Sequence, residues 1–127
     1  MNLLLDTQIV LWWLGDTPEL PDEVRAAVQD TDNVVYVSAA AIWEIAIKRA
    51  LGKLEIGDDY VTEIAEQGFV ELPVRWHHAE LVEALPMLHR DPFDRLLIAQ
   101  AQTLGLTLVT TDAMIHEYAV NVLPARA

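Results

Sequence analysis

The fold of this chain is decided by residues 91–112, which read DPFDRLLIAQAQTLGLTLVTTD. Asp91-Pro92 favours an extended or turn conformation, because the proline ring disfavours the helical conformation in the residue before it. The pattern then predicts a helix that begins at residue 93 or 94, continues to 104 and is stopped by Gly105. A continuous apolar run follows and predicts a buried strand over 106–110, with Asp112 just beyond its end.

The same alternation of helices and strands extends over the rest of the chain. We expect strands at 1–5, 34–37, 69–72, 106–110 and 120–123, and helices at 7–14, 21–30, 39–51, 58–67, 77–85, 93–104 and 113–118. The strands are continuous apolar runs, which is typical of a parallel sheet covered on both faces and joined by right-handed crossovers. The sequence therefore predicts an α/β fold, a three-layer α/β/α sandwich on a parallel sheet of four to five strands.

Length and composition limit the class of protein. The 127 residues match one domain, expected over 1–127. Cysteine is absent, which excludes disulfides, thiolate metal sites and cysteine nucleophiles. No apolar run approaches the ~20 residues of a membrane helix, and Asp6 interrupts the apolar N-terminus. We expect a cytoplasmic protein without a membrane partner.

The charge balance is strongly acidic. The chain has 20 Asp and Glu residues against 8 Lys and Arg residues, a formal net charge of −12. Such a chain repels phosphate backbones at long range, which argues against tight non-specific binding of nucleic acid. It does not exclude a nuclease, because carboxylates can hold metal ions that present positive charge to phosphate.

Four acidic residues fall at one edge of the predicted sheet. Asp6 closes the first strand and Asp112 follows the fourth. Glu44 lies in the second turn of the helix that leaves the second strand, and Asp94 begins the helix that enters the fourth. Ligands of open parallel sheets bind beyond the carboxyl ends of the strands, which is this edge.

Each acid also has a purely structural interpretation. Asp6, Asp94 and Asp112 could each cap the helix that follows. Glu44 could be a surface residue paired with Lys48 at i+4, although its apolar neighbours indicate a helix buried around much of its circumference. Four acids at one edge repel one another, and a hard divalent cation, Mg²⁺ or Mn²⁺, removes that repulsion.

These motifs, in this order, resemble the PIN domain family over essentially the whole chain. The resemblance is carried by residues 3–7 (LLLDT), 37–39 (VSA) with 43–45 (WEI), 91–101 (DPFDRLLIAQA) and 109–112 (VTTD). A lone domain of this length is similar to the VapC toxins of bacterial type II toxin–antitoxin systems. The resemblance implies a metal-dependent endoribonuclease with a PIN-like fold.

The resemblance also implies a set of site residues. The family has a catalytic quartet of acidic residues that holds Mg²⁺ or Mn²⁺. Its counterparts in this sequence are Asp6, Glu44, Asp94 and Asp112. Thr110 matches a hydroxyl position that supports the site. Asp94 stands four residues before Ile98, where many members have three, so Asp91 stays open as the third acid.

The sequence and the resemblance also suggest how a substrate and partners would bind. Basic residues near the acids could contact the phosphates of an RNA substrate. They follow Glu44 on its helix and at the helix end, or flank the third acid: Lys48, Arg49, Lys53 and Arg95. No covalent nucleophile is indicated, and the four histidines are not at metal-ligand spacing. The family implies an RNA substrate, a homodimer and a VapB-like antitoxin whose basic tail enters the acidic groove.

Two other functions compete with a nuclease. One is a PIN-like domain that has lost catalysis and serves only as a binding partner. The other is an aspartate phosphoacceptor or phosphatase. That class needs a lysine late in the chain or a second aspartate two places after the first. The last lysine here is Lys53, and the second position is Gln8.

Overall fold

The computed structural model describes residues 1–124 and contains a five-stranded sheet whose paired strands are all parallel. The strands lie in the order β3-β2-β1-β4-β5. Their bounds are β1 Asn2–Leu5, β2 Val34–Ser38, β3 Val70–Leu72, β4 Thr107–Val109 and β5 Val122–Leu123. The central strand β1 pairs Leu5 with Val37 on one side and with Val109 on the other. The predicted parallel α/β sheet is confirmed.

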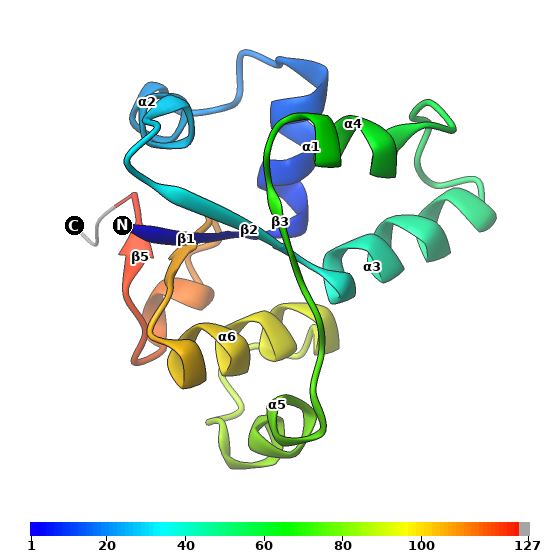
Figure 1. Cartoon of the computed structure of the whole chain (residues 1–127). Helices are drawn as coiled ribbons and strands as arrows, with labels where there is room; N and C mark the ends of the chain where they lie inside the picture. Colours follow the sequence, from blue (N-terminus) through cyan, green and yellow to red (C-terminus); the bar gives the residue numbers. More distant parts are fainter. Residues whose placement is uncertain (125–127) are drawn as a thin grey trace.

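Helices cover both faces of the sheet (Figure 1). The helices are α1 Thr7–Gly15, α2 Asp22–Gln29, α3 Ala39–Ala50, α4 Tyr60–Glu66, α5 Trp76–Leu81 and α6 Pro92–Leu104, with 3₁₀ turns η1 Val82–Ala84 and η2 Ile115–Glu117. Because strand side chains alternate, Leu3 and Leu5 pack with α1, α2 and α4, whereas Leu4 packs with α6. This is the predicted three-layer arrangement. No helix in the described part of the chain is long and apolar enough to cross a bilayer.

Two predicted helices are shorter than expected. The helix predicted over 77–85 is α5 followed by the 3₁₀ turn η1. Pro86 lacks an N–H, so the carbonyl of Val82 cannot accept an α-helical hydrogen bond from residue 86. It accepts the Leu85 N–H at 3.2 Å in the 3₁₀ turn and a second hydrogen bond from Arg95 at 2.9 Å. The helix predicted over 113–118 is only the 3₁₀ turn η2, and Tyr118 leaves it in an extended conformation.

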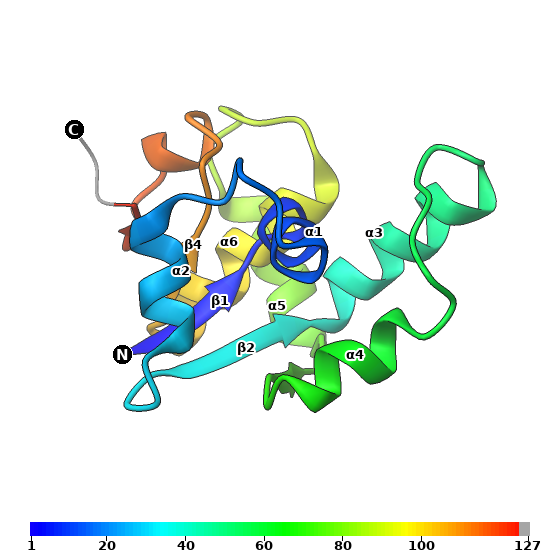
Figure 2. The ribbon, with the colours of Figure 1, turned by 90° about the horizontal axis from the view of Figure 1, so that it is seen from above.

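Helix α3 is less buried than the sequence predicted. It runs outward beyond the carboxyl end of the sheet (Figure 2), and its Trp43 side chain is 60% exposed. The expectation of burial around much of the circumference is therefore wrong. Glu44 is nevertheless 6% exposed, and α3 lies against α1 at this point, where Thr7 contacts Glu44.

Candidate active site at the carboxyl edge of the sheet

One pocket collects the predicted acidic residues. It has a volume of about 270 Å³ and lies where β1 and β4 end. Its lining consists of five carboxylates, one lysine and four other residues: Asp6, Glu44, Asp91, Asp94, Asp112, Lys48, Thr7, Gln8, Leu11 and Thr111. Parallel strands end at the same edge, so segments far apart in sequence converge there. The structure thus brings together all four acids of the predicted quartet, with Asp91 beside them.

Asp6 acts as a helix cap inside this pocket. Its Oδ1 atom accepts a hydrogen bond from the Ile9 N–H at 2.8 Å, at the start of α1. The pKa of Asp6 is raised to about 6. Burial is the main cause and the charges of Asp112 and Glu44 add to it, whereas hydrogen bonds from Thr110 and Ile9 oppose it. The cap uses one oxygen, and the carboxylate still faces the other acids. Asp6 can therefore cap α1 and take part in the acidic pocket at the same time.

Glu44 is held by two neighbours. The Thr7 hydroxyl donates to its Oε1 atom at 2.6 Å, and the Lys48 ammonium lies 2.9 Å from its Oε2 atom. The hydrogen bond to Glu44 raises the pKa of Lys48. The i+4 pairing considered for Glu44 is present, but the carboxylate is buried rather than on the surface. Thr7 was not predicted, although its place directly after Asp6 puts it at the same edge.

Asp91 and Asp94 both line the pocket, with different local roles. Asp91 caps α6, because its Oδ1 atom accepts from the N–H groups of Phe93 at 2.8 Å and Asp94 at 3.1 Å. Asp94 lies in the first turn of α6. The pKa of Asp94 is raised to about 7, chiefly by burial and then by the charges of Asp91 and Asp6, while His89 opposes the rise.

His89 joins two of the acids. Its Nε2 atom lies 3.0 Å from Asp94 Oδ2 and 2.9 Å from Asp112 Oδ2. The three side chains offer ligand atoms within 4.8 Å of one another. The spacing of the histidines along the chain did not predict that His89 lies at the site, since spacing does not determine which groups a loop brings together. A histidine two residues before a helix-capping aspartate was the available signal.

Thr110 links the two strand-end aspartates. It is fully buried, its hydroxyl accepts the Asp112 N–H at 3.0 Å, and it hydrogen-bonds the Asp6 side chain. Asp112 in turn accepts from the Met114 N–H at 2.9 Å. The hydroxyl therefore fixes the relative positions of Asp6 and Asp112.

The predicted basic contacts do not form one cluster. Lys48 lines the pocket, whereas Arg49 pairs with Asp58 and lies 5.1 Å over the ring of Tyr60. Lys53 is exposed beyond the end of α3. The structure therefore places only the first of these three cations at the acidic pocket.

Arg95 requires a correction, because it is only 7% exposed and its guanidinium points into the protein. It donates to one hydroxyl and four carbonyl oxygens, those of Tyr118, Val82, Leu85, Pro86 and His89. Its donors are thus used within the protein, and the expectation that it contacts RNA does not hold for this structure.

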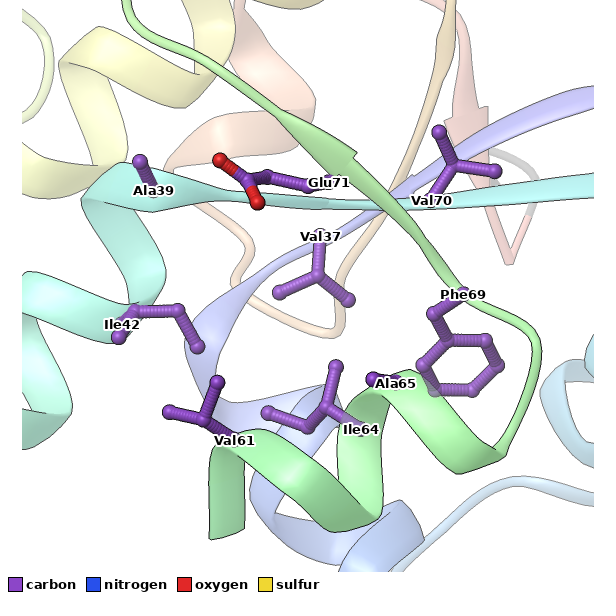
Figure 3. Close-up of a pocket in the computed structure, with 9 residues that line it drawn as sticks. All are labelled: Val37, Ala39, Ile42, Val61, Ile64, Ala65, Phe69, Val70 and Glu71. Atoms are coloured by element: carbon purple, nitrogen blue, oxygen red, sulfur yellow. The ribbon is translucent and has the colours of Figure 1, made fainter.

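A second pocket, of about 260 Å³, lies between β2, the edge strand β3, α3 and α4 (Figure 3). Its walls are formed mainly by aliphatic and aromatic side chains, including Ile42, Ile64 and Phe69, and Glu71 is its one titratable residue. It offers apolar surface but no set of groups for acid–base or metal chemistry. The chemistry of the described chain therefore concentrates in the acidic pocket.

The donor set of the acidic pocket fits a hard divalent cation. Five carboxylates supply oxygen ligands, and Lys48 is the one lysine or arginine that lines the pocket. The raised pKa values of Asp6 and Asp94 indicate that these carboxylates lack sufficient positive charge nearby. Mg²⁺ and Mn²⁺ prefer such oxygen ligands.

Comparison with known proteins places the chain in context. The family model of the PIN domain matches residues 3–121. A segment of 33 residues is 58% identical to Ribonuclease VapC16 of Mycobacterium tuberculosis, covering 26% of this chain and 23% of that protein. The chain therefore matches about a quarter of the length of this curated relative.

Solved structures share the fold over nearly the whole chain. A crystal structure of VapBC2 from Rickettsia felis, bound to a DNA fragment from their promoter, matches with a TM-score of 0.69 and 15% identity, covering 96% of this chain and 97% of that chain. FitAcB from Neisseria gonorrhoeae matches with a TM-score of 0.61 and 24% identity, covering 94% and 95%. The structure of FitAB bound to an IR36 DNA fragment has a TM-score of 0.61 and 22% identity, covering 95% and 93%.

Proposed function

The chain belongs to the PIN domain family, and on that premise we propose that it is a VapC-like toxin, an endoribonuclease that depends on Mg²⁺ or Mn²⁺. The observation that carries this proposal is the convergence of five carboxylates from separate parts of the chain on one pocket. In the proposal, residues 1–127 form a single PIN domain that acts in the cytoplasm.

Within this proposal, Asp6 and Asp112 are the principal metal ligands. Asp6 directly follows β1 and Asp112 lies just beyond β4, and these two strands are neighbours in the sheet. The Thr110 hydroxyl hydrogen-bonds both residues and so fixes their relative positions. Asp94 and Glu44 complete the shell, directly or through water. Asp91 has a supporting role and is not a principal ligand, because its Oδ1 atom already caps α6.

The chemistry is hydrolysis of a phosphodiester bond in single-stranded RNA. When bound, a divalent ion lowers the pKa of a coordinated water and neutralises the charge that develops on phosphate. The Thr7 hydroxyl and the Lys48 ammonium orient the Glu44 carboxylate from either side. Lys48 is also 46% exposed in its side chain, so it can contact a substrate phosphate at the mouth of the pocket.

We propose a VapB-like antitoxin as the partner, with the toxin forming a homodimer. Support comes from the similar structures, which include VapBC2 and FitAB, each bound to a DNA fragment. The net charge of −12 complements a basic segment of such a partner, whose arginine or lysine would compete for the acidic pocket.

Cleavage of a fluorescent single-stranded RNA tests the proposed activity. We expect the purified chain to cut RNA with Mn²⁺ or Mg²⁺ and to lose activity in EDTA. Asp6→Asn and Asp112→Asn should each reduce the rate by at least ~100-fold, because each removes a charged ligand. Glu80→Gln, an exposed change on α5, is the matched control and should retain activity. Chelator-resistant cutting, or full activity in both aspartate variants, would overturn the proposal.

A further inference from the structure

We propose that His89 is a positioning residue of the acidic pocket, whose Nε2–H group holds Asp94 and Asp112 at the separation a cation needs without itself ligating the cation. This inference rests on the proposed function, because it takes the pocket to be a metal site. It assigns a role to a residue that lies outside the acidic quartet.

The backbone of His89 is fixed at both of its polar groups. Its N–H donates to the Tyr118 hydroxyl at 2.8 Å, and its carbonyl accepts from Arg95 at 3.4 Å. Both partners also bond the carbonyl of Pro86, at 2.8 Å from Tyr118 and 2.9 Å from Arg95. The loop that carries His89 is therefore held by the Tyr118 hydroxyl and the Arg95 guanidinium, and these contacts fix the position of the imidazole.

The backbone of Asp91 determines which ring nitrogen carries the proton. The Asp91 N–H donates to His89 Nδ1 at 3.1 Å, so Nδ1 is an acceptor and the proton of the neutral ring sits on Nε2. A histidine that ligates a metal through Nε2 needs its lone pair there, and it normally donates its other N–H to an oxygen. His89 has the opposite arrangement. Its Nε2 atom is a donor aimed at the carboxylates.

Asp94 and Asp112 would repel each other without such a donor. The Nε2 atom stands between their Oδ2 atoms, at 3.0 Å and 2.9 Å, and so offsets that repulsion. Each carboxylate oxygen has more than one lone pair, so both groups keep capacity for a cation. In metal sites, hydrogen-bonding partners of the ligands typically contribute 10–100-fold to affinity. His89 occupies such a place for two ligands at once.

Titration of Mn²⁺ by calorimetry tests this role in the full chain. We expect His89→Ala to weaken Mn²⁺ binding about 10-fold or more. His89→Gln should recover most of the loss, because its amide N–H can still donate to a carboxylate. His77→Ala changes an exposed histidine of α5 and should bind as the unchanged chain does. Thermal melts followed by circular dichroism confirm that each variant is folded.

A second measurement needs no variant. Electron spin echo modulation of bound Mn²⁺ detects a directly coordinated imidazole nitrogen through its ¹⁴N coupling, and we expect no such coupling in the unchanged chain. A direct ¹⁴N coupling would overturn the inference by making His89 a ligand. Unchanged or tighter binding in His89→Ala would overturn it as well, while leaving the metal site in place. If the unchanged chain binds no Mn²⁺, the proposed function itself fails.

Discussion

At the scale of single residues, Asp6 shows how one side chain serves the fold and the site together. It caps α1 through the Ile9 N–H, and its own N–H donates to the Val109 carbonyl of β4 at 3.0 Å. These contacts leave it buried among other acids, which raises its pKa to about 6. The fold therefore accepts a destabilising carboxylate at this position, as expected where a cation is to be bound.

The raised pKa of Asp6 predicts how stability depends on pH in metal-free protein. The folded state retains a proton on Asp6 up to about pH 6, whereas the unfolded chain loses it near pH 4. The stability from this group is therefore present at low pH and lost as pH rises through 6. In EDTA, the free energy of unfolding should fall between pH 5 and 8 by about 1 kcal/mol more in the unchanged chain than in Asp6→Asn.

Urea unfolding at the two pH values measures this difference. Asparagine caps a helix about as well as aspartate, so the variant removes the titration and keeps the cap. Asp22→Asn, at an exposed position in the first turn of α2, is the control and should keep the slope of the unchanged chain. Equal slopes in all three proteins would contradict the assignment of a buried, perturbed Asp6.

At the scale of elements, Arg95 stabilises the segment that connects α5 to α6 by donating hydrogen bonds to its backbone carbonyls. It bridges the carbonyls of η1, the loop before α6 and the Tyr118 hydroxyl. Arg95→Met removes the hydrogen bonds that the buried guanidinium donates to these groups and should lower the free energy of unfolding by about 3 kcal/mol. Arg95→Lys should not restore it, because a single ammonium cannot reproduce the guanidinium fork.

Arg25→Met is the matched control for this prediction. Arg25 forms an ion pair with the largely exposed Asp16, and such pairs contribute at most about 1 kcal/mol. Denaturant unfolding of the two methionine variants gives the comparison. If Arg95→Met were as stable as Arg25→Met, the network around Arg95 would not support the loop as we describe.

The sequence predicts the elements and the acids better than it predicts the loop between them. Strands stand out as continuous apolar runs, and parallel topology then forces Asp6 and Asp112 to one edge. His89 was missed because its position depends on Tyr118, 29 residues away, which no local pattern reports. Arg95 was misplaced for a related reason, since a charged residue near the third acid gives no sign of being buried against backbone carbonyls.

At the scale of the whole molecule, the acidic charge makes a specific cation effect measurable. The chain carries a net charge of −12, and any salt relieves part of the resulting repulsion. Mn²⁺ should raise the melting temperature beyond the effect of NaCl at equal ionic strength, because it binds only the folded pocket. At 100 times its dissociation constant, a bound ion adds about 2.7 kcal/mol of stability.

Asp112→Asn separates the two effects in this melting experiment. It should keep the response to NaCl, which depends on overall charge, and lose the additional response to Mn²⁺. An additional Mn²⁺ response that survives in Asp112→Asn would place the cation elsewhere on the acidic surface.

The most direct measurement is the position of Mn²⁺ in a crystal of the chain, located by its anomalous scattering. The account predicts an ion in the acidic pocket, within coordination distance of carboxylate oxygens of Asp6 and Asp112, with Asp94 beside it and the His89 imidazole outside the coordination shell. A crystal saturated with Mn²⁺ in which these carboxylates hold no ion would contradict it.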